Sequence, residues 1–211
     1  MKTFISFTLL LIVNQSFASD EKYIEAMQKN IAGVYQAQSI EELQKHVNAL
    51  ERIGGAEKSK WEPFYYAAFG YIMMSTRGEQ PTKRDAWLDQ AATALAKAGE
   101  ISQDNAEIVA LEGFILMMKV AVDPGTRGPQ LSGLAMQTFG KALAIDPNNP
   151  RALSLLSQMQ LGTARFFNSP IDEACKSAKA ALEKFESFKS DNPLAPTWGK
   201  EMTKELVSQC N

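Results

Sequence analysis

The sequence predicts an all-α protein built as a solenoid of about four antiparallel helix pairs, with one further helix covering the C-terminal end. Apolar residues recur at helical spacing in successive stretches between residues 20 and 209. Pro, Gly, Asn and Asp residues of the kind that begin and end helices separate these stretches. A small, large, small pattern also recurs about 44 residues apart, and a repeat near this length indicates stacked helix pairs. The two triplets are Ala91, Leu95, Ala98 and Ala135, Phe139, Ala142.

The first pair of predicted helices is joined by a short link, which favours antiparallel packing. Residues 20–37 carry apolar side chains at helical spacing and predict the first helix. Ser39 and Glu42 form a capping-box sequence that begins the second helix. We expect that helix to end near Gly54 and Gly55 or one turn later.

The second pair begins at another capping-box sequence, formed by Ser59 and Glu62. The helix that follows is apolar around much of its circumference, which is typical of a helix packed on two sides or lining a groove. Residues 76–84 contain Gly and Pro and predict a polar loop, and the next helix is expected over residues 85–101.

The third pair starts at Asn105, whose side chain can cap a helix, and its first helix is expected to end at Asp123. A stiff loop through Gly128 and Pro129 should then lead into a helix that stops before Pro147.

The fourth pair follows Asn149 and Pro150, which suit the cap and first position of a helix over residues 151–166. Ser169 and Pro170 are expected to begin its partner helix in the same way. After a Pro-rich loop, residues 197–209 predict the last helix, which would shield the apolar face of the fourth pair from water.

The N-terminal residues 1–18 read as a signal peptide: a charged start, a short apolar run and a small-residue cleavage site. We therefore expect a mature single domain over residues 19–211, exported to the periplasm or secreted. No later window is apolar enough to span a membrane. A net charge of −2 lacks the basic excess of a nucleic-acid binder.

Cys175 and Cys210 are the only cysteines, and in an oxidising compartment they are expected to form a disulfide. The bridge would close a loop of roughly 35 residues and contribute about 3–4 kcal/mol to stability. Two buried free thiols are the alternative.

The triplet that ends with Ala142, together with Pro147, resembles the second helix of the tetratricopeptide repeat (TPR). The earlier triplet matches more loosely, because Gln103 stands where that proline would be. Loops at 76–84 and 123–130 stretch the usual period of about 34 residues to about 44, so the resemblance is to a divergent repeat. It implies a right-handed solenoid. Residues 193–200 and the cysteine pair also resemble those of small exported repeat proteins of Gram-negative bacteria.

In such arrays the first helix of each pair lines a concave surface that grips a peptide or partner protein. Carried over by position, this resemblance implies a lining with an apolar end and a polar end. Aromatic and Met side chains suit an adaptable apolar groove. The alternative is that the apolar members are core between helix pairs. The expected lining residues are Tyr66, Phe69, Met73, Phe114, Met117, Arg151, Ser154 and Gln158.

Arg77 and Arg127 both occur in the pattern Thr-Arg-Gly-x-Gln, each after the first helix of a pair. Helix termination explains most of this motif, because Gly permits a left-handed turn and Arg can reach the last carbonyls. The alternative hypothesis is a paired anion site at one edge of the array.

Enzyme chemistry has little support in the sequence. His46 is the only histidine, and no nucleophile motif, phosphate-binding loop or cluster with metal-ligand spacing occurs. We therefore expect neither a catalytic residue nor a metal or cofactor site, and a non-enzymatic protein-interaction module as the function. A self-associating structural protein of the envelope is the second hypothesis, and a carboxylate-dependent envelope hydrolase is the third.

Overall fold

The computed structural model describes residues 5–210, with side chains from Asp20 onward. Within this range the chain forms nine α-helices and no strand. They are α1 (Ile5–Gln36), α2 (Ile40–Ala56), α3 (Glu62–Arg77), α4 (Pro81–Ile101), α5 (Ala106–Val122), α6 (Pro124–Ile145), α7 (Pro150–Phe166), α8 (Asp172–Ser187) and α9 (Lys200–Ser208).

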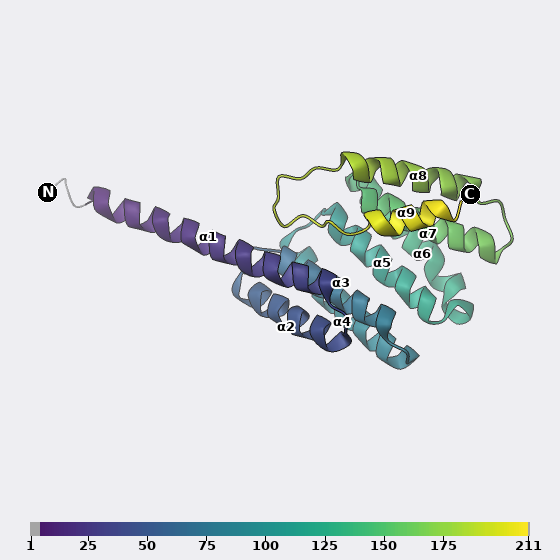
Figure 1. Ribbon diagram of the computed structural model, residues 1–211, viewed down its shortest axis with the longest axis horizontal. Helices are drawn as coiled ribbons and strands as arrows, with labels where there is room; N and C mark the ends of the chain where they lie inside the picture. Colours follow the sequence, from purple (N-terminus) through teal and green to yellow (C-terminus); the bar gives the residue numbers. More distant parts are fainter. Residues whose placement is uncertain (1–4, 211) are drawn as a thin grey trace.

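The helices stack as sequential antiparallel pairs, and each helix packs against the next one along the chain. The first helices of neighbouring pairs also touch one another: α1 contacts α3, α3 contacts α5, and α5 contacts α7. These four helices therefore form the inner wall of the array, and α2, α4, α6 and α8 lie outside it (Figure 1). The predicted all-α solenoid is confirmed for residues 5–210.

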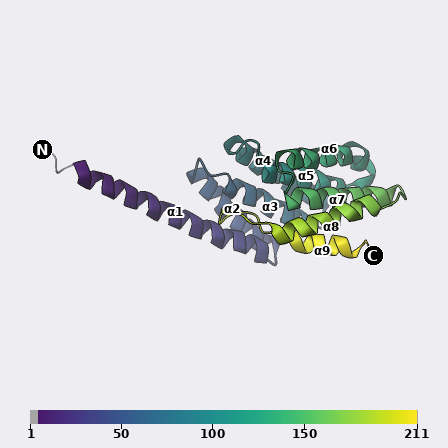
Figure 2. The same cartoon turned by 90° about the horizontal axis from the view of Figure 1, so that it is seen from above.

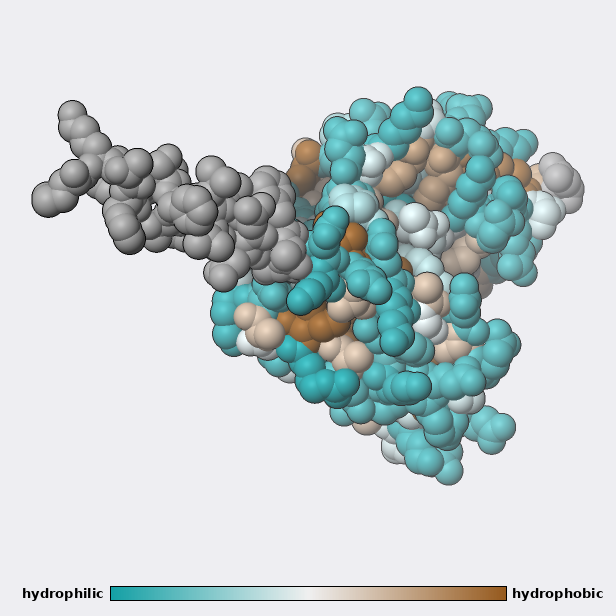
Figure 3. All heavy atoms as spheres, turned by 60° about the vertical axis from the view of Figure 1, so that its left-hand side comes forward, coloured by the Kyte–Doolittle hydropathy of each residue, from teal (hydrophilic) through white to brown (hydrophobic). Residues whose placement is uncertain are grey.

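The chain turns back after α8, and α9 packs against α8 as the predicted terminal helix (Figures 1 and 2). Figure 3 shows one face of the molecule, on which apolar side chains reach the surface in separate patches between hydrophilic ones. Among the described residues, no helix is both long enough and apolar enough to cross a membrane. The predicted signal peptide, residues 1–18, falls outside the residues whose side chains are described, and its cleavage stays a prediction.

Three of the predicted helix caps are confirmed. The backbone N–H of Glu42 donates to Ser39 Oγ at 3.1 Å, and Asn105 and Asn149 accept from amides in the first turns of α5 and α7. Two further predictions are wrong, since neither Ser59 nor Ser169 caps a helix. Helices α3 and α8 start after Trp61 and Ile171 respectively, with no side-chain cap.

Besides α1, which begins at Ile5 and not at residue 20, two helix starts were predicted too late. Helix α4 begins at Pro81, where the fixed backbone angle of proline suits a first helical position. Helix α6 begins at Pro124, because the Asp123 carboxylate accepts from the backbone N–H of Thr126 at 3.2 Å and caps it. The expected loop through Gly128 and Pro129 is therefore helical, and Pro129 lies inside α6.

The repeated triplets are buried as the pattern predicts, each of the six side chains being at most 4% exposed. Phe139 packs directly against Gly113 of α5: a Cβ atom on this glycine would come within 2.5 Å of the Phe139 ring. The absence of a side chain at Gly113 thus lets α5 and α6 pack closely around the aromatic ring.

Candidate functional site

The inner wall of the array is filled by residues 194–203 of the same chain, hereafter the C-terminal segment. The indole of Trp198 stacks on Phe69 of α3 and Phe114 of α5, with ring centroids 5.0 and 5.8 Å apart. Both ring pairs are 24° from parallel. All three side chains are buried, so this aromatic stack closes the centre of the wall.

Hydrogen bonds fix the same segment in register. The Tyr66 hydroxyl donates to the backbone carbonyl of Leu194 at 2.8 Å, and the Trp198 indole N–H donates to the Tyr65 hydroxyl at 3.1 Å. Burial raises the pKa of Tyr65 far above its usual value, and the nearby carboxylate of Glu107 raises it further. Tyr65 is therefore protonated and serves as a hydrogen-bonding group.

Arg151 is the charged centre of this region, and its side chain is only 1% exposed. Its Nε and Nη2 atoms donate to the two carboxylate oxygens of Glu107, each at 2.6 Å. The guanidinium also lies over the rings of Phe188, Phe185 and Trp198, at 4.6, 5.9 and 5.9 Å from their centroids. Burial lowers the pKa of Arg151, but the hydrogen bonds and charge of Glu107 more than offset this and leave it raised.

Gly199 lets the segment turn into α9. Its φ angle is 108°, in the left-handed region that favours glycine. A Cβ atom there would also come 2.7 Å from Phe185 Cζ. In the first turn of α9, the Thr203 hydroxyl lies 2.7 Å from that of Ser154 on α7.

Five of the eight predicted lining residues lie on the inner wall, and there they contact the protein's own C-terminal segment. Met73 is half-buried against the core. Met117 and Gln158 instead line a separate pocket described below. The role of the predicted set in binding a partner stays a prediction. The five residues in contact with the segment are Tyr66, Phe69, Phe114, Arg151 and Ser154.

The pocket lies between the end of α5, the start of α6, the second half of α7 and the end of α9. It holds about 480 Å³, within the roughly 300–1,000 Å³ that small-molecule sites occupy. Its lining is mainly apolar: Met117, Met118, Val120, Ala121, Pro124, Gly128, Pro129, Ser132, Gln158, Met159, Leu161, Gly162, Thr163, Arg165, Phe166, Phe167, Leu206 and Gln209.

Two phenylalanines at the edge of this pocket are unusually exposed. Phe166 and Phe167 have relative exposures of 73% and 69%, and their rings meet edge to face with centroids 5.0 Å apart. Adjacent aromatic side chains left in water mark a binding surface more often than scattered apolar residues do. Sequence reasoning missed this pair, although two aromatics directly before the Asn168 turn are a visible signal.

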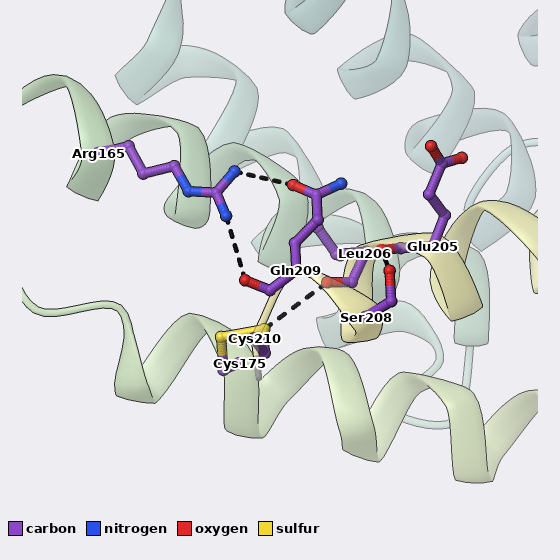
Figure 4. The surroundings of a disulfide bond; sticks show 7 residues. All are labelled: Arg165, Cys175, Glu205, Leu206, Ser208, Gln209 and Cys210. Carbon is purple, nitrogen blue, oxygen red and sulfur yellow. Dashed lines mark hydrogen bonds between the residues drawn. A yellow bond between two sulfur atoms is a disulfide. The ribbon is translucent and has the colours of Figure 1, made fainter.

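Arg165 is the only charged residue among the described side chains that line the pocket. Its guanidinium donates to the side-chain oxygen of Gln209 at 2.8 Å and to the Gln209 backbone carbonyl at 3.2 Å (Figure 4). Gln209 is tethered in turn, because the next residue, Cys210, is bonded to Cys175 of α8. The predicted disulfide is present, with an S–S distance of 2.06 Å.

The two arginines of the repeated Thr-Arg-Gly-x-Gln pattern each bind a group of the chain itself. Arg77 Nη2 donates to the backbone carbonyl of Ala37 at 2.8 Å. Arg127 makes a two-pronged ion pair with Asp85, at 2.6 and 2.8 Å. The hydrogen bonds from Arg127 lower the pKa of Asp85. The first contact joins α3 to the link between α1 and α2, and the second joins α6 to α4; an anion site formed by the two arginines stays a prediction.

His46 lies on α2, where its Nδ1 atom is 3.1 Å from Asn30 Oδ1 on α1. A Cβ atom on Gly33 would come 2.2 Å from the same imidazole ring, so the ring is packed between the first two helices. Among the described side chains, no three His, Cys, Asp or Glu residues are grouped so that they could hold a metal ion.

Comparison with known proteins finds no matching family model and no matching curated sequence. Two of the similar solved structures match almost the whole chain. The HusA haemophore from Porphyromonas gingivalis is 25% identical with a TM-score of 0.79, covering 90% of this chain and 92% of that one. A thermophilic TPR protein of Thermus thermophilus is 16% identical with a TM-score of 0.55, covering 94% and 97%. The chain is thus a divergent repeat protein with the TPR-like fold.

Proposed function

We propose that this protein is an exported, non-enzymatic binding protein that takes up haem or a related tetrapyrrole in the pocket between α5, α6, α7 and α9. One observation carries the proposal. The inner wall is filled by the chain's own Leu194 and Trp198, whereas the pocket of about 480 Å³ is open and edged by exposed Phe166 and Phe167. The similar HusA structure is that of a haemophore, which supports the choice of ligand.

The side chains of the pocket suit a flat apolar macrocycle. Met117, Met118 and Met159 offer polarisable thioethers, which adapt to irregular apolar ligands and can also coordinate haem iron. His46, the only histidine of the chain, is packed between α1 and α2 and does not line the pocket. Any axial ligand that this pocket supplies is therefore a thioether, and most of the affinity comes from contact with the ring.

Export is part of the proposal. The disulfide between Cys175 and Cys210 is stable in an oxidising compartment, and the haemophore likeness points the same way. A protein that collects a ligand outside the cytoplasm requires no catalytic group, only a site that excludes water from the apolar ring.

Titration with haemin, followed by its visible absorbance, tests the proposal. Changing both Phe166 and Phe167 to Ser should weaken haemin binding by about tenfold or more, because the ligand loses its contacts with two aromatic rings. Both side chains are exposed in the folded protein. Leu134→Ser is the matched control, since Leu134 is 43% exposed on α6 and does not line the pocket. Wild-type protein that leaves the haemin spectrum unchanged would contradict the proposal.

A peptide or protein partner at the same surface is the second candidate, and the exposure of Phe166 and Phe167 favours it. Exposed aromatic side chains commonly anchor protein interfaces. Cross-linking in the native envelope distinguishes the two candidates. A partner captured by wild type and by Leu134→Ser, but not by the double Ser variant, supports this second function if haemin does not bind.

A further inference from the structure

Arg165 has no acidic partner among the described residues, unlike two other arginines of the array. Arg127 and Arg151 each bind a carboxylate through two nitrogen atoms. No carboxylate of residues 20–210 lies within ion-pair distance of Arg165, whose hydrogen-bond partners are two neutral oxygens of Gln209. Within that part of the chain, its positive charge is therefore uncompensated at the edge of an apolar pocket.

The position of the Arg165 guanidinium is fixed before any ligand arrives. Both terminal nitrogens are held by Gln209, at 2.8 and 3.2 Å. The end of α9 is itself tied to α8 by the disulfide at Cys210, as Figure 4 shows. A guanidinium has five N–H donors, so the two bonds to Gln209 leave others for an incoming anion. A donor held in place in this way loses little conformational entropy on binding.

The pocket as a whole therefore combines an apolar slot with a single cation at one edge. A ligand that is complementary to both parts has an apolar ring body and a carboxylate at its periphery. A carboxylate can accept two parallel hydrogen bonds from a guanidinium, which is the strongest and most directional of the ordinary ion-pair geometries.

We propose that Arg165 is the anion-recognition residue of this pocket, which selects amphipathic ligands carrying a carboxylate over neutral ligands of the same shape. The inference rests on the proposed function, since the propionates of a tetrapyrrole supply the carboxylate. Gln209 and the disulfide act as positioning groups, because they hold the guanidinium at the edge of the slot.

The test compares protoporphyrin IX with its dimethyl ester, which has the same ring but no carboxylate. Wild type should bind the free acid about tenfold more tightly or better, as a charged hydrogen bond predicts. Arg165→Gln should lose this preference while its affinity for the ester stays unchanged. Arg52→Gln on α2 is the matched control and should behave like wild type. If Arg165→Gln kept the preference, or weakened both ligands equally, the inference would be overturned.

A second pair of probes separates failure of this inference from failure of the proposed function. Anilinonaphthalene sulfonate and neutral N-phenylnaphthylamine share one ring system and differ in the anionic group. If wild type binds neither porphyrin, the proposed function fails. In that case, a preference of wild type for the sulfonate dye that disappears in Arg165→Gln still supports anion recognition by Arg165. Equal affinity of wild type for the two dyes overturns the inference.

Discussion

Arg151 and Glu107 form a two-pronged ion pair, with side chains 1% and 14% exposed, in which both carboxylate oxygens accept from the guanidinium at 2.6 Å. The pair joins α7 to α5. Arg151 also donates a hydrogen bond to the backbone carbonyl of Trp198 at 3.5 Å, and so connects the inner wall to the C-terminal segment. Asn149 donates a further hydrogen bond to Glu107 at 2.7 Å. This pair is therefore expected to hold together three parts of the fold.

Glu107→Gln should lower the free energy of unfolding by about 3–5 kcal/mol, because it leaves the guanidinium of Arg151 buried without a counter-charge. Urea denaturation measures the change. Asp85→Asn is the matched control: it breaks the partly exposed pair with Arg127 and should cost about 1 kcal/mol or less. Equal losses in the two variants would show that burial does not set the strength of the Arg151 pair.

Gly199→Ala should destabilise the protein, because residue 199 has a positive φ angle and the added methyl group would clash with the Phe185 ring. Gly140→Ala provides the comparison, since Gly140 is exposed inside α6 with nothing within 4 Å of the added Cβ. That variant should gain roughly 0.5–1 kcal/mol from helix propensity. Melting temperatures that shift in the same direction for both variants would contradict the role given to Gly199 in the turn into α9.

Replacing Cys175 and Cys210 together with Ala should cost about 3–4 kcal/mol of stability, as expected for a bridge that closes a loop of this length. It should also weaken ligand binding, because Leu206 and Gln209 of the tethered end form part of the pocket. Haemin titration well below the melting temperature of the variant separates the two effects. Unchanged affinity in the folded variant would mean that the pocket does not depend on the tether.

The ion pair between Asp85 and Arg127 should make stability depend on pH in the acid range. Since Arg127 holds the pKa of Asp85 below its unfolded value of about 3.9, the contribution is fully present above that value. It is lost as the pH falls through the lower folded pKa. The stability difference between wild type and Asp85→Asn should therefore shrink on going from pH 7 to pH 3 in urea unfolding experiments. A constant difference would contradict the assignment.

The helical array could be predicted because each helix is specified by residues that are close together in the sequence. Apolar spacing located all nine helices of the described region, and the triplets ending at Ala98 and Ala142 identified the buried faces. The errors occurred at helix starts. Ser59 and Ser169 fit a capping pattern that the backbone does not use, and the Pro124 start was hidden because the Gly and Pro residues after it resemble a loop.

The site was harder to predict because it depends on contacts between distant residues. Trp198 binds Tyr65 across 133 positions, and no local pattern indicates that it fills the inner wall. The predicted lining therefore lies on the wall that the protein's own segment contacts, and its role in binding a partner stays a prediction. The pocket is likewise assembled from four helices. Of its lining, only Met117 and Gln158 were named from the sequence, and the adjacent Phe166 and Phe167 were a signal that was not used.

In the proposed function, a tetrapyrrole occupies the pocket between α5, α6, α7 and α9 and not the inner wall. Methyl NMR of the mature protein labelled at its methionines distinguishes the two locations, with diamagnetic gallium protoporphyrin as the probe. We predict large ring-current shifts for Met117, Met118 and Met159, which line the pocket, and none for Met74, which is fully buried elsewhere. Shifts centred on Met73 of the inner wall, or no shifts at all, would contradict the proposal.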